Sequence, residues 1–192
     1  MAIQIRVQAL GAPSVMIEGK VVNAWDGITI ENVFYFIVDG CLQEYESARN
    51  TGFRTLDDFA ASIWGNTPIQ EAETNLERVR ERVAWKIGNE AAWKNPQSRS
   101  QDPRLIIDVD HRFFLGTGVE VIYDVKAFED AYRIARYTEN LHADQAWTSA
   151  LHLYSGPYLH GTQITSPWVR QRREELENMH QVILRHLEWL GF

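Results

Sequence analysis

Three side chains in the middle of the chain have the types and spacing to contact a polyanion. Thr74, Arg78 and Arg82 recur every four residues, so a helix would place Thr74 and Arg78 on one face and Arg82 on the flank of that face. A guanidinium group donates hydrogen bonds in a planar fork that fits phosphate oxygens and the acceptor edge of guanine. Arg112 adds a fourth candidate in a polar turn farther along the chain. Their types make these residues candidates for contact with a polyanion, and spacing alone does not establish such a contact.

The same arginines have an alternative interpretation as ordinary surface residues. Glu81 stands three residues after Arg78 and could pair with it, and carboxylates neighbouring Glu81 could pair with Arg82. Such pairs stabilise a helix by only about 0.2–0.5 kcal/mol. Spacing alone leaves both interpretations open.

Patterns that would indicate catalysis or a metal site are weak. Gly116-Thr117-Gly118 is one short glycine match, better interpreted as a connection between strands. The six histidines are scattered; His142, His152 and His160 fit surface or hydrogen-bonded positions better than a metal site. Cys41 lies in an apolar helical stretch and is interpreted as a core residue. We therefore expect no enzyme activity, no bound metal and no cofactor.

The arginines fall within a helix predicted over residues 67–88. Thr67 can cap the first turn, Pro68 suits the first helical position, and Gly88 is a typical stop. One face carries an apolar stripe at helical spacing: Ile69, Ala72, Leu76, Val79, Val83 and Ile87. The opposite face carries Glu71, Thr74, Arg78, Glu81 and Trp85, with Arg82 on its flank.

A second helix is predicted just upstream, which gives a helix-turn-helix candidate. Thr55 and Asp58 have capping-box spacing, and this helix ends at Gly65-Asn66. The alternative is two ordinary packed helices. Downstream, residues 105–115 are expected to form a hairpin with its turn at residues 110–112, near His111 and Arg112. A hairpin in this place is typical of a winged helix, in which the hairpin is the wing and its tip lies along the sugar–phosphate backbone.

The rest of the chain completes an α+β pattern. Alternating residues between 3 and 22 predict a small antiparallel N-terminal sheet. Residues 29–45 have helical periodicity, residues 89–104 are polar and loop-like, and residues 119–123 fit a strand. Beyond Asp124 the pattern is purely helical, with three helices near 128–135, 146–154 and 166–190 and no convincing internal repeat.

Charge and composition narrow the function classes. The net charge is −7, which argues against a sequence-independent nucleic-acid binder, so any DNA contact must come from a local cluster. No apolar run approaches the roughly 20 residues that span a bilayer, and the N-terminus lacks the blocks of a signal peptide. The single cysteine allows no internal disulfide and suggests a reducing compartment. We expect a cytoplasmic protein with no membrane partner.

The C-terminal helices carry a resemblance to a known domain. The runs at 150–159 (ALHLYSGPYL), 167–169 (PWV) and 172–176 (RREEL) resemble the bacterial transcriptional activator domain, which is similar to tetratricopeptide repeats. In the Streptomyces antibiotic regulatory protein family, that domain directly follows an OmpR-like winged helix. Residues 123–128 (YDVKAF) resemble the entry into it, and residues 56–65, 75–76, 82–83 and 87–88 resemble the two helices of the winged helix.

The resemblance implies a fold and a function. The fold is α+β: a winged helix-turn-helix at residues 1–122, followed at residues 123–192 by the start of an all-α domain similar to tetratricopeptide repeats. The function implied is a transcriptional regulator, in the first instance an activator, that binds double-stranded DNA at promoter repeats as a homodimer and contacts RNA polymerase. The family continues past the position of Phe192, so we expect a fragment or a shortened member. The DNA contacts implied are Thr74, Arg78, Arg82, Trp85 and Arg112.

A second hypothesis is a protein–protein interaction module whose winged helix has lost its affinity for DNA. Ala84 and Trp85 stand where the family usually has basic residues, and carboxylates share the outer face with the arginines. An exposed tryptophan suits a protein interface better than a phosphate surface. Dimerisation is expected separately, because the apolar stripe of the last helix has few following helices to cover it: Val169, Leu176, Met179, Ile183, Leu187 and Leu190.

Overall fold

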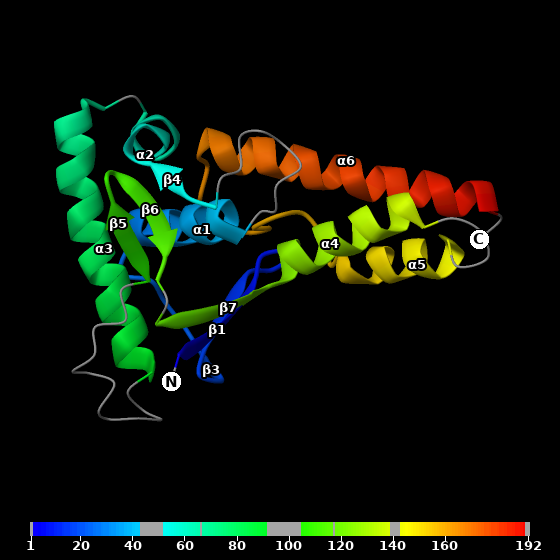
Figure 1. Cartoon of the computed structure of the whole chain (residues 1–192), viewed down its shortest axis with the longest axis horizontal. Helices are drawn as coiled ribbons and strands as arrows, with labels where there is room; N and C mark the ends of the chain where they lie inside the picture. Colours follow the sequence, from blue (N-terminus) through cyan, green and yellow to red (C-terminus); the bar gives the residue numbers. More distant parts are fainter. Residues whose placement is uncertain are drawn as a thin grey trace. The chain divides into compact units, whose positions relative to one another are not determined.

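Helices and two small sheets make up an α+β protein (Figure 1). The computed structural model describes residues 2–42, 52–65, 67–91, 105–116, 118–138 and 143–190. Its contacts group the chain into two compact units. The first comprises Met1–Val7 and Ser14–Ile122, and the second comprises Gln8–Pro13 and Tyr123–Phe192.

The first sheet has four strands in the order β3-β2-β1-β7. They are β1 (Ile3–Gln8), β2 (Ser14–Ile17), β3 (Lys20–Val21) and β7 (Val119–Tyr123). Along β1, buried and exposed residues alternate strictly, as expected for a strand with one face on the core. Ile17 pairs with Lys20 across a two-residue turn in which Glu18 and Gly19 both have positive φ. This turn geometry matches the twist of a hairpin.

Three helices and a second sheet complete the first unit. The helices are α1 (Ile28–Leu42), α2 (Leu56–Ser62) and α3 (Ile69–Ala91). The sheet has the order β4-β6-β5, formed by β4 (Arg54–Thr55), β5 (Ile106–Val109) and β6 (Arg112–Leu115). Helix α1 contacts both α3 and β6, and the ring of Phe59 meets those of Phe36 and Phe113 edge to face. These three phenylalanines therefore form part of the hydrophobic core of the first unit.

Several predicted boundaries in this unit are wrong. Helix α3 begins at Ile69 and runs through Gly88 to Ala91, because Gly88 keeps helical backbone on the buried side. Ile69 is 37% exposed and does not belong to the buried stripe. Helix α2 ends at Ser62, before Gly65. The rest of the predicted 89–104 loop, at 92–104, and the end of the predicted 29–45 helix, at 43–45, lie outside the described residues.

The capping prediction is confirmed for one helix. The backbone N–H of Asp58 donates to the Thr55 hydroxyl, and the Asp58 carboxylate accepts the N–H of Thr55, which completes a capping box at α2. At α3 the Thr67 hydroxyl instead donates to the carbonyl of Trp64, over 2.7 Å. That bond belongs to the connection between α2 and α3, not to the first turn of α3.

The described residues of the second unit form three helices: α4 (Asp124–Tyr137), α5 (Ala143–Leu153) and α6 (Pro167–Leu190). Helix α5 contacts both α4 and α6. The stripe of α6 is covered, contrary to the sequence expectation, because Val169, Leu176, Ile183 and Leu187 are all buried within the chain. An uncovered stripe is therefore no argument for a dimer. None of the described helices is both long and apolar enough to cross a membrane.

A short extended segment at Gln8–Pro13 belongs to this helical unit. The backbone N–H groups of Ala9 and Leu10 both donate to the Asp124 carboxylate, each over 2.9 Å. Leu10 also pairs with Tyr158 in an isolated antiparallel bridge. The first residue of α4 thus ties a distant part of the chain into the unit.

Candidate nucleic-acid interface

Helix α3 separates its residues into a buried stripe and an exposed face. Ala72, Leu76, Val79, Val83 and Ile87 are all buried. The predicted contact residues of α3 lie on the exposed side, where Trp85 reaches 62% exposure: Thr74, Arg78, Arg82 and Trp85. The helical period alone was sufficient to place them, because burial follows the apolar positions.

The structure does not contain the ion pairs that the alternative interpretation assigned to Arg78 and Arg82. Among the described residues, neither Arg78 nor Arg82 forms an ion pair or a hydrogen bond with a carboxylate. The Thr74 hydroxyl donates to the carbonyl of Gln70, one turn back, over 3.0 Å. Both guanidinium groups therefore keep their donors available for a ligand from outside.

Arg80 joins α3 to the neighbouring hairpin, which the sequence did not predict. Its guanidinium donates to the carbonyl of Ile106 over 3.3 Å and lies 3.8 Å from the carboxylate of Asp108. It also pairs with Glu77 on its own helix, at 3.2 Å. Arg80 thus fastens strand β5 to α3. Arg80 follows Val79 at the edge of the apolar stripe, and this position was the one feature of the sequence that could have indicated a contact with the hairpin.

The β5–β6 hairpin turns through two residues of left-handed backbone. Asp110 has φ +53° and His111 has φ +59°, and Val109 pairs with Arg112 on either side. The N–H of His111 donates to the Asp108 carboxylate over 3.0 Å, which holds the turn in place. His111 Nδ1 also lies 3.9 Å from the Glu73 carboxylate of α3. The turn is therefore located beside the N-terminal half of α3.

Arg112 comes from the first residue of β6. Its side chain is exposed, and its guanidinium carbon lies 5.2 Å from the ring centroid of Phe53. An arginine over an aromatic face is held by a cation–π attraction of about 0.5–1 kcal/mol at an exposed site. The ring limits the positions of this guanidinium while leaving it accessible.

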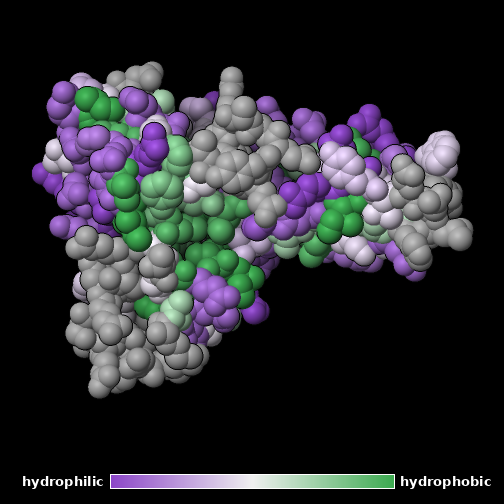
Figure 2. Space-filling model, viewed as in Figure 1, coloured by the Kyte–Doolittle hydropathy of each residue, from purple (hydrophilic) through white to green (hydrophobic). Residues whose placement is uncertain are grey.

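Carboxylates are exposed on α3 and also line a cavity beside it. An open cavity of about 460 Å³ between α3 and the hairpin is lined by Glu77, Asp108 and Asp110 together with Arg80 and His111. Glu71 and Glu81 are also exposed on α3. In Figure 2 the visible side of α3 is largely hydrophilic, and hydrophobic residues gather over the neighbouring hairpin. For a polyanion to approach this side of α3, Arg78, Arg82 and Arg112 would have to offset the negative charge of these carboxylates.

Comparison with known proteins adds a likeness of fold. The chain matches no family model, and none of the curated proteins matches it. Among solved structures it is similar to Mycobacterium tuberculosis EmbR in complex with a low-affinity phosphopeptide, with a TM-score of 0.64 and 13% identity. The match covers 96% of this chain and 45% of the EmbR chain, so this chain spans less than half of that protein. At this identity the likeness shows the fold.

Proposed function

We propose that this protein is a DNA-binding transcriptional regulator of the Streptomyces antibiotic regulatory protein type. The fold is like that of EmbR, a regulator of that family, and the sequence resemblance runs in the same order along the chain. In this proposal the first unit is a winged helix-turn-helix, with α3 as recognition helix and the β5–β6 hairpin as wing. The second unit is an activator domain similar to tetratricopeptide repeats.

The observation that carries the proposal is the unpaired state of Arg78 and Arg82 on the exposed face of α3. Within the described part of the chain their guanidinium groups have no carboxylate partner, although Glu77 and Glu81 are close in sequence. A recognition helix enters the major groove with such side chains toward base edges. The hairpin supports the same geometry, because Arg112 would then meet the sugar–phosphate backbone.

The proposal also gives the binding partners and the cellular compartment of the protein. The regulator binds double-stranded DNA repeats as a homodimer in the cytoplasm and contacts RNA polymerase through its helical unit. It acts by binding, without catalysis or a cofactor, and has no membrane partner.

The test is a binding titration followed by fluorescence anisotropy. The probe is a labelled duplex from the region upstream of the protein's own gene, in 50 mM salt with up to micromolar protein. Replacing both Arg78 and Arg82 by alanine should weaken binding at least about 30-fold, since each good contact to a base edge contributes about 1–3 kcal/mol and two are removed. Arg185→Ala is the matched control, because Arg185 is an exposed arginine on α6. No binding by the wild type, or equal loss in the control, would overturn the proposal.

A second candidate function is a protein-binding module. The observation that favours it is Trp85, which is 62% exposed on the face that also carries Glu71 and Glu81. Tryptophan is enriched in the centres of protein interfaces. In this alternative Trp85→Ala abolishes binding to the partner, whereas the Arg78/Arg82 double variant leaves it intact and no duplex is bound.

A further inference from the structure

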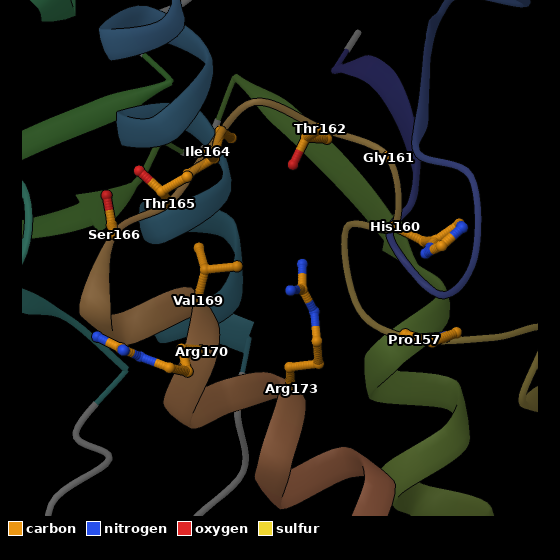
Figure 3. Close-up of a pocket in the computed structure, with 10 residues that line it drawn as sticks. All are labelled: Pro157, His160, Gly161, Thr162, Ile164, Thr165, Ser166, Val169, Arg170 and Arg173. Atoms are coloured by element: carbon orange, nitrogen blue, oxygen red, sulfur yellow. The ribbon is translucent and has the colours of Figure 1, made fainter.

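A second cavity lies wholly within the helical unit, between the 157–166 connection and the first turns of α6. Its volume is about 500 Å³, within the range of small-molecule sites. Figure 3 shows the residues that line it. Six of them carry polar side-chain groups: His160, Thr162, Thr165, Ser166, Arg170 and Arg173.

The charge of this cavity is opposite to that of the protein. Two arginines and a histidine line it, and none of the described residues that line it is an aspartate or a glutamate. The whole chain has a net charge of −7, and the cavity beside α3 contains three carboxylates. The cationic lining is therefore a local property and not a consequence of composition.

Two hydrogen bonds to backbone carbonyls hold the guanidinium of Arg173, and its other N–H groups can still donate to a ligand. Its Nε donates to the carbonyl of Tyr158 over 2.9 Å, and its Nη2 donates to that of Leu159 over 3.3 Å. Among the described residues its third nitrogen, Nη1, has no partner. Two bonds to backbone carbonyls fix the plane of the guanidinium, so the remaining edge is oriented before a ligand arrives.

Figure 3 shows what that edge faces. Arg173 extends from α6 into the space below Thr162, whose hydroxyl is directed toward it, while Arg170 points away along the edge of the cavity. The Thr162 hydroxyl donates to the Leu159 carbonyl over 3.1 Å and can rotate to donate to a ligand. Helix α6 also begins here without an acidic residue in its first turn, so its N-terminal partial charge is not neutralised locally.

From these observations we propose that the cavity binds the phosphate group of a small phosphorylated molecule. The guanidinium of Arg173 and the hydroxyl of Thr162 approach from different elements, which suits a tetrahedral group with oxygens in several directions. The rest of the cavity accommodates the remainder of the molecule. This site is an effector site, separate from the residues proposed to contact DNA, and its test needs no DNA.

The test is an NMR titration of the ¹⁵N-labelled full chain. Inorganic phosphate and glycerol 3-phosphate are the probes, and sodium chloride keeps the ionic strength constant. We expect saturable shifts confined to residues 157–173, including the Nε–H of Arg173, and at least threefold tighter binding of the ester. Thr162→Glu, which places a carboxylate against Arg173, should reduce the affinity at least tenfold, and Arg173→Lys should do the same.

Control variants separate a lost site from a lost fold. Arg185→Lys changes an exposed arginine of the same helix and should leave the affinity unchanged. Thermal unfolding of each variant checks its fold, and Thr162→Glu remains informative if Arg173→Lys unfolds. Absence of saturation, shifts that sodium chloride alone reproduces, or equal affinity in the folded Thr162→Glu variant would each overturn the proposal.

Discussion

At the scale of single residues, Cys41 illustrates how burial sets chemical behaviour. Burial raises the pKa of this thiol to about 11, while the positive charge of Arg54 and a backbone hydrogen bond from Leu115 partly oppose the rise. The thiol therefore remains protonated at neutral pH. Because only the thiolate reacts, the interpretation of Cys41 as a packing residue agrees with its chemistry.

A reactivity measurement checks this. At pH 8 the thiolate fraction of Cys41 should be about 200-fold below that of a free thiol with a pKa near 8.5, and Ellman's reagent should react correspondingly more slowly. The rate should rise about tenfold per pH unit as the pH approaches 11. The urea-unfolded chain is the control and should react at the ordinary rate. An ordinary rate in the folded chain would contradict the burial of this thiol.

Asp124 is a second residue whose role is specific. Its carboxylate accepts the backbone N–H groups of Ala9 and Leu10. In Asp124→Asn one N–H faces an NH₂ group, which should lower the free energy of unfolding by about 1–3 kcal/mol in urea denaturation. Asp110→Asn is the control, since asparagine also tolerates the left-handed turn, and should change stability by less than about 0.5 kcal/mol. Equal effects would contradict the assigned role.

Residue-scale prediction from the sequence succeeded where the signal is periodic. The exposure of Thr74, Arg78 and Arg82 follows from the apolar positions on α3. Arg80 and Asp124 could not be assigned in that way, because their partners are distant in sequence. The bond from Arg80 to Ile106 spans 26 residues, and that from Ala9 to Asp124 spans 115. Only the fold brings such groups together.

At the scale of elements, Gly40 of α1 has a role that helix propensity does not reveal. A Cβ at this position would overlap the guanidinium group of Arg54. The Arg54 guanidinium packs over the ring of Phe36 at 4.2 Å, and its Nη2 lies 3.7 Å from the buried carboxylate of Asp39. Gly40 therefore makes room for an arginine that joins β4 to α1.

Gly40→Ala tests whether the clash with Arg54 outweighs the gain in helix propensity. Propensity alone predicts a gain of about 1 kcal/mol, whereas displacement of Arg54 should cost about 1–3 kcal/mol. We expect net destabilisation in urea denaturation. The control is the same change in an Arg54→Ala background, where the clash is absent and the cost should shrink or reverse. Stabilisation by Gly40→Ala in the wild-type background would contradict the packing described.

Replacement of Arg80 tests whether this residue stabilises the β5–β6 hairpin against α3. Arg80→Ala removes the link from α3 to Ile106 and Asp108, so the hairpin should open more often. Amide hydrogen exchange in β5 and β6 should accelerate about tenfold, which corresponds to about 1.4 kcal/mol. Arg82→Ala, on the exposed face, should leave exchange unchanged. Equal protection in the Arg80→Ala variant would show that the hairpin does not depend on this residue.

The ends of helices and strands were harder to predict from the sequence than their presence. Gly88 has the residue type of a helix stop, yet it remains in α3 because its neighbours on the buried face, Val83 and Ile87, continue to pack. Glycine ends a helix where the chain must take positive φ, and here tertiary packing decides otherwise. Strand β4 has two residues, too few to give a periodic signal.

At the scale of the whole molecule, the sequence predicted the α+β class and the order of the helices and strands other than β4. It did not predict that Gln8–Pro13 belongs to the helical unit or that the α6 stripe is covered within the chain. Both depend on long-range packing. The acidic net charge also belongs to this scale, because it opposes any approach to DNA and leaves a few local arginines to compensate.

The most direct test of the proposed function is the salt dependence of duplex binding. Each phosphate contact contributes a slope of about −0.9 to log K against log salt concentration. If Arg78 and Arg82 meet phosphates, wild-type affinity should fall steeply with salt, and the double alanine variant should have a slope shallower by about 2. If they meet only base edges, the slope is unchanged and the affinity of the variant is lower at every salt concentration. Identical affinities of the two proteins throughout the titration, or no duplex binding by the wild type in low salt, would contradict DNA recognition through α3.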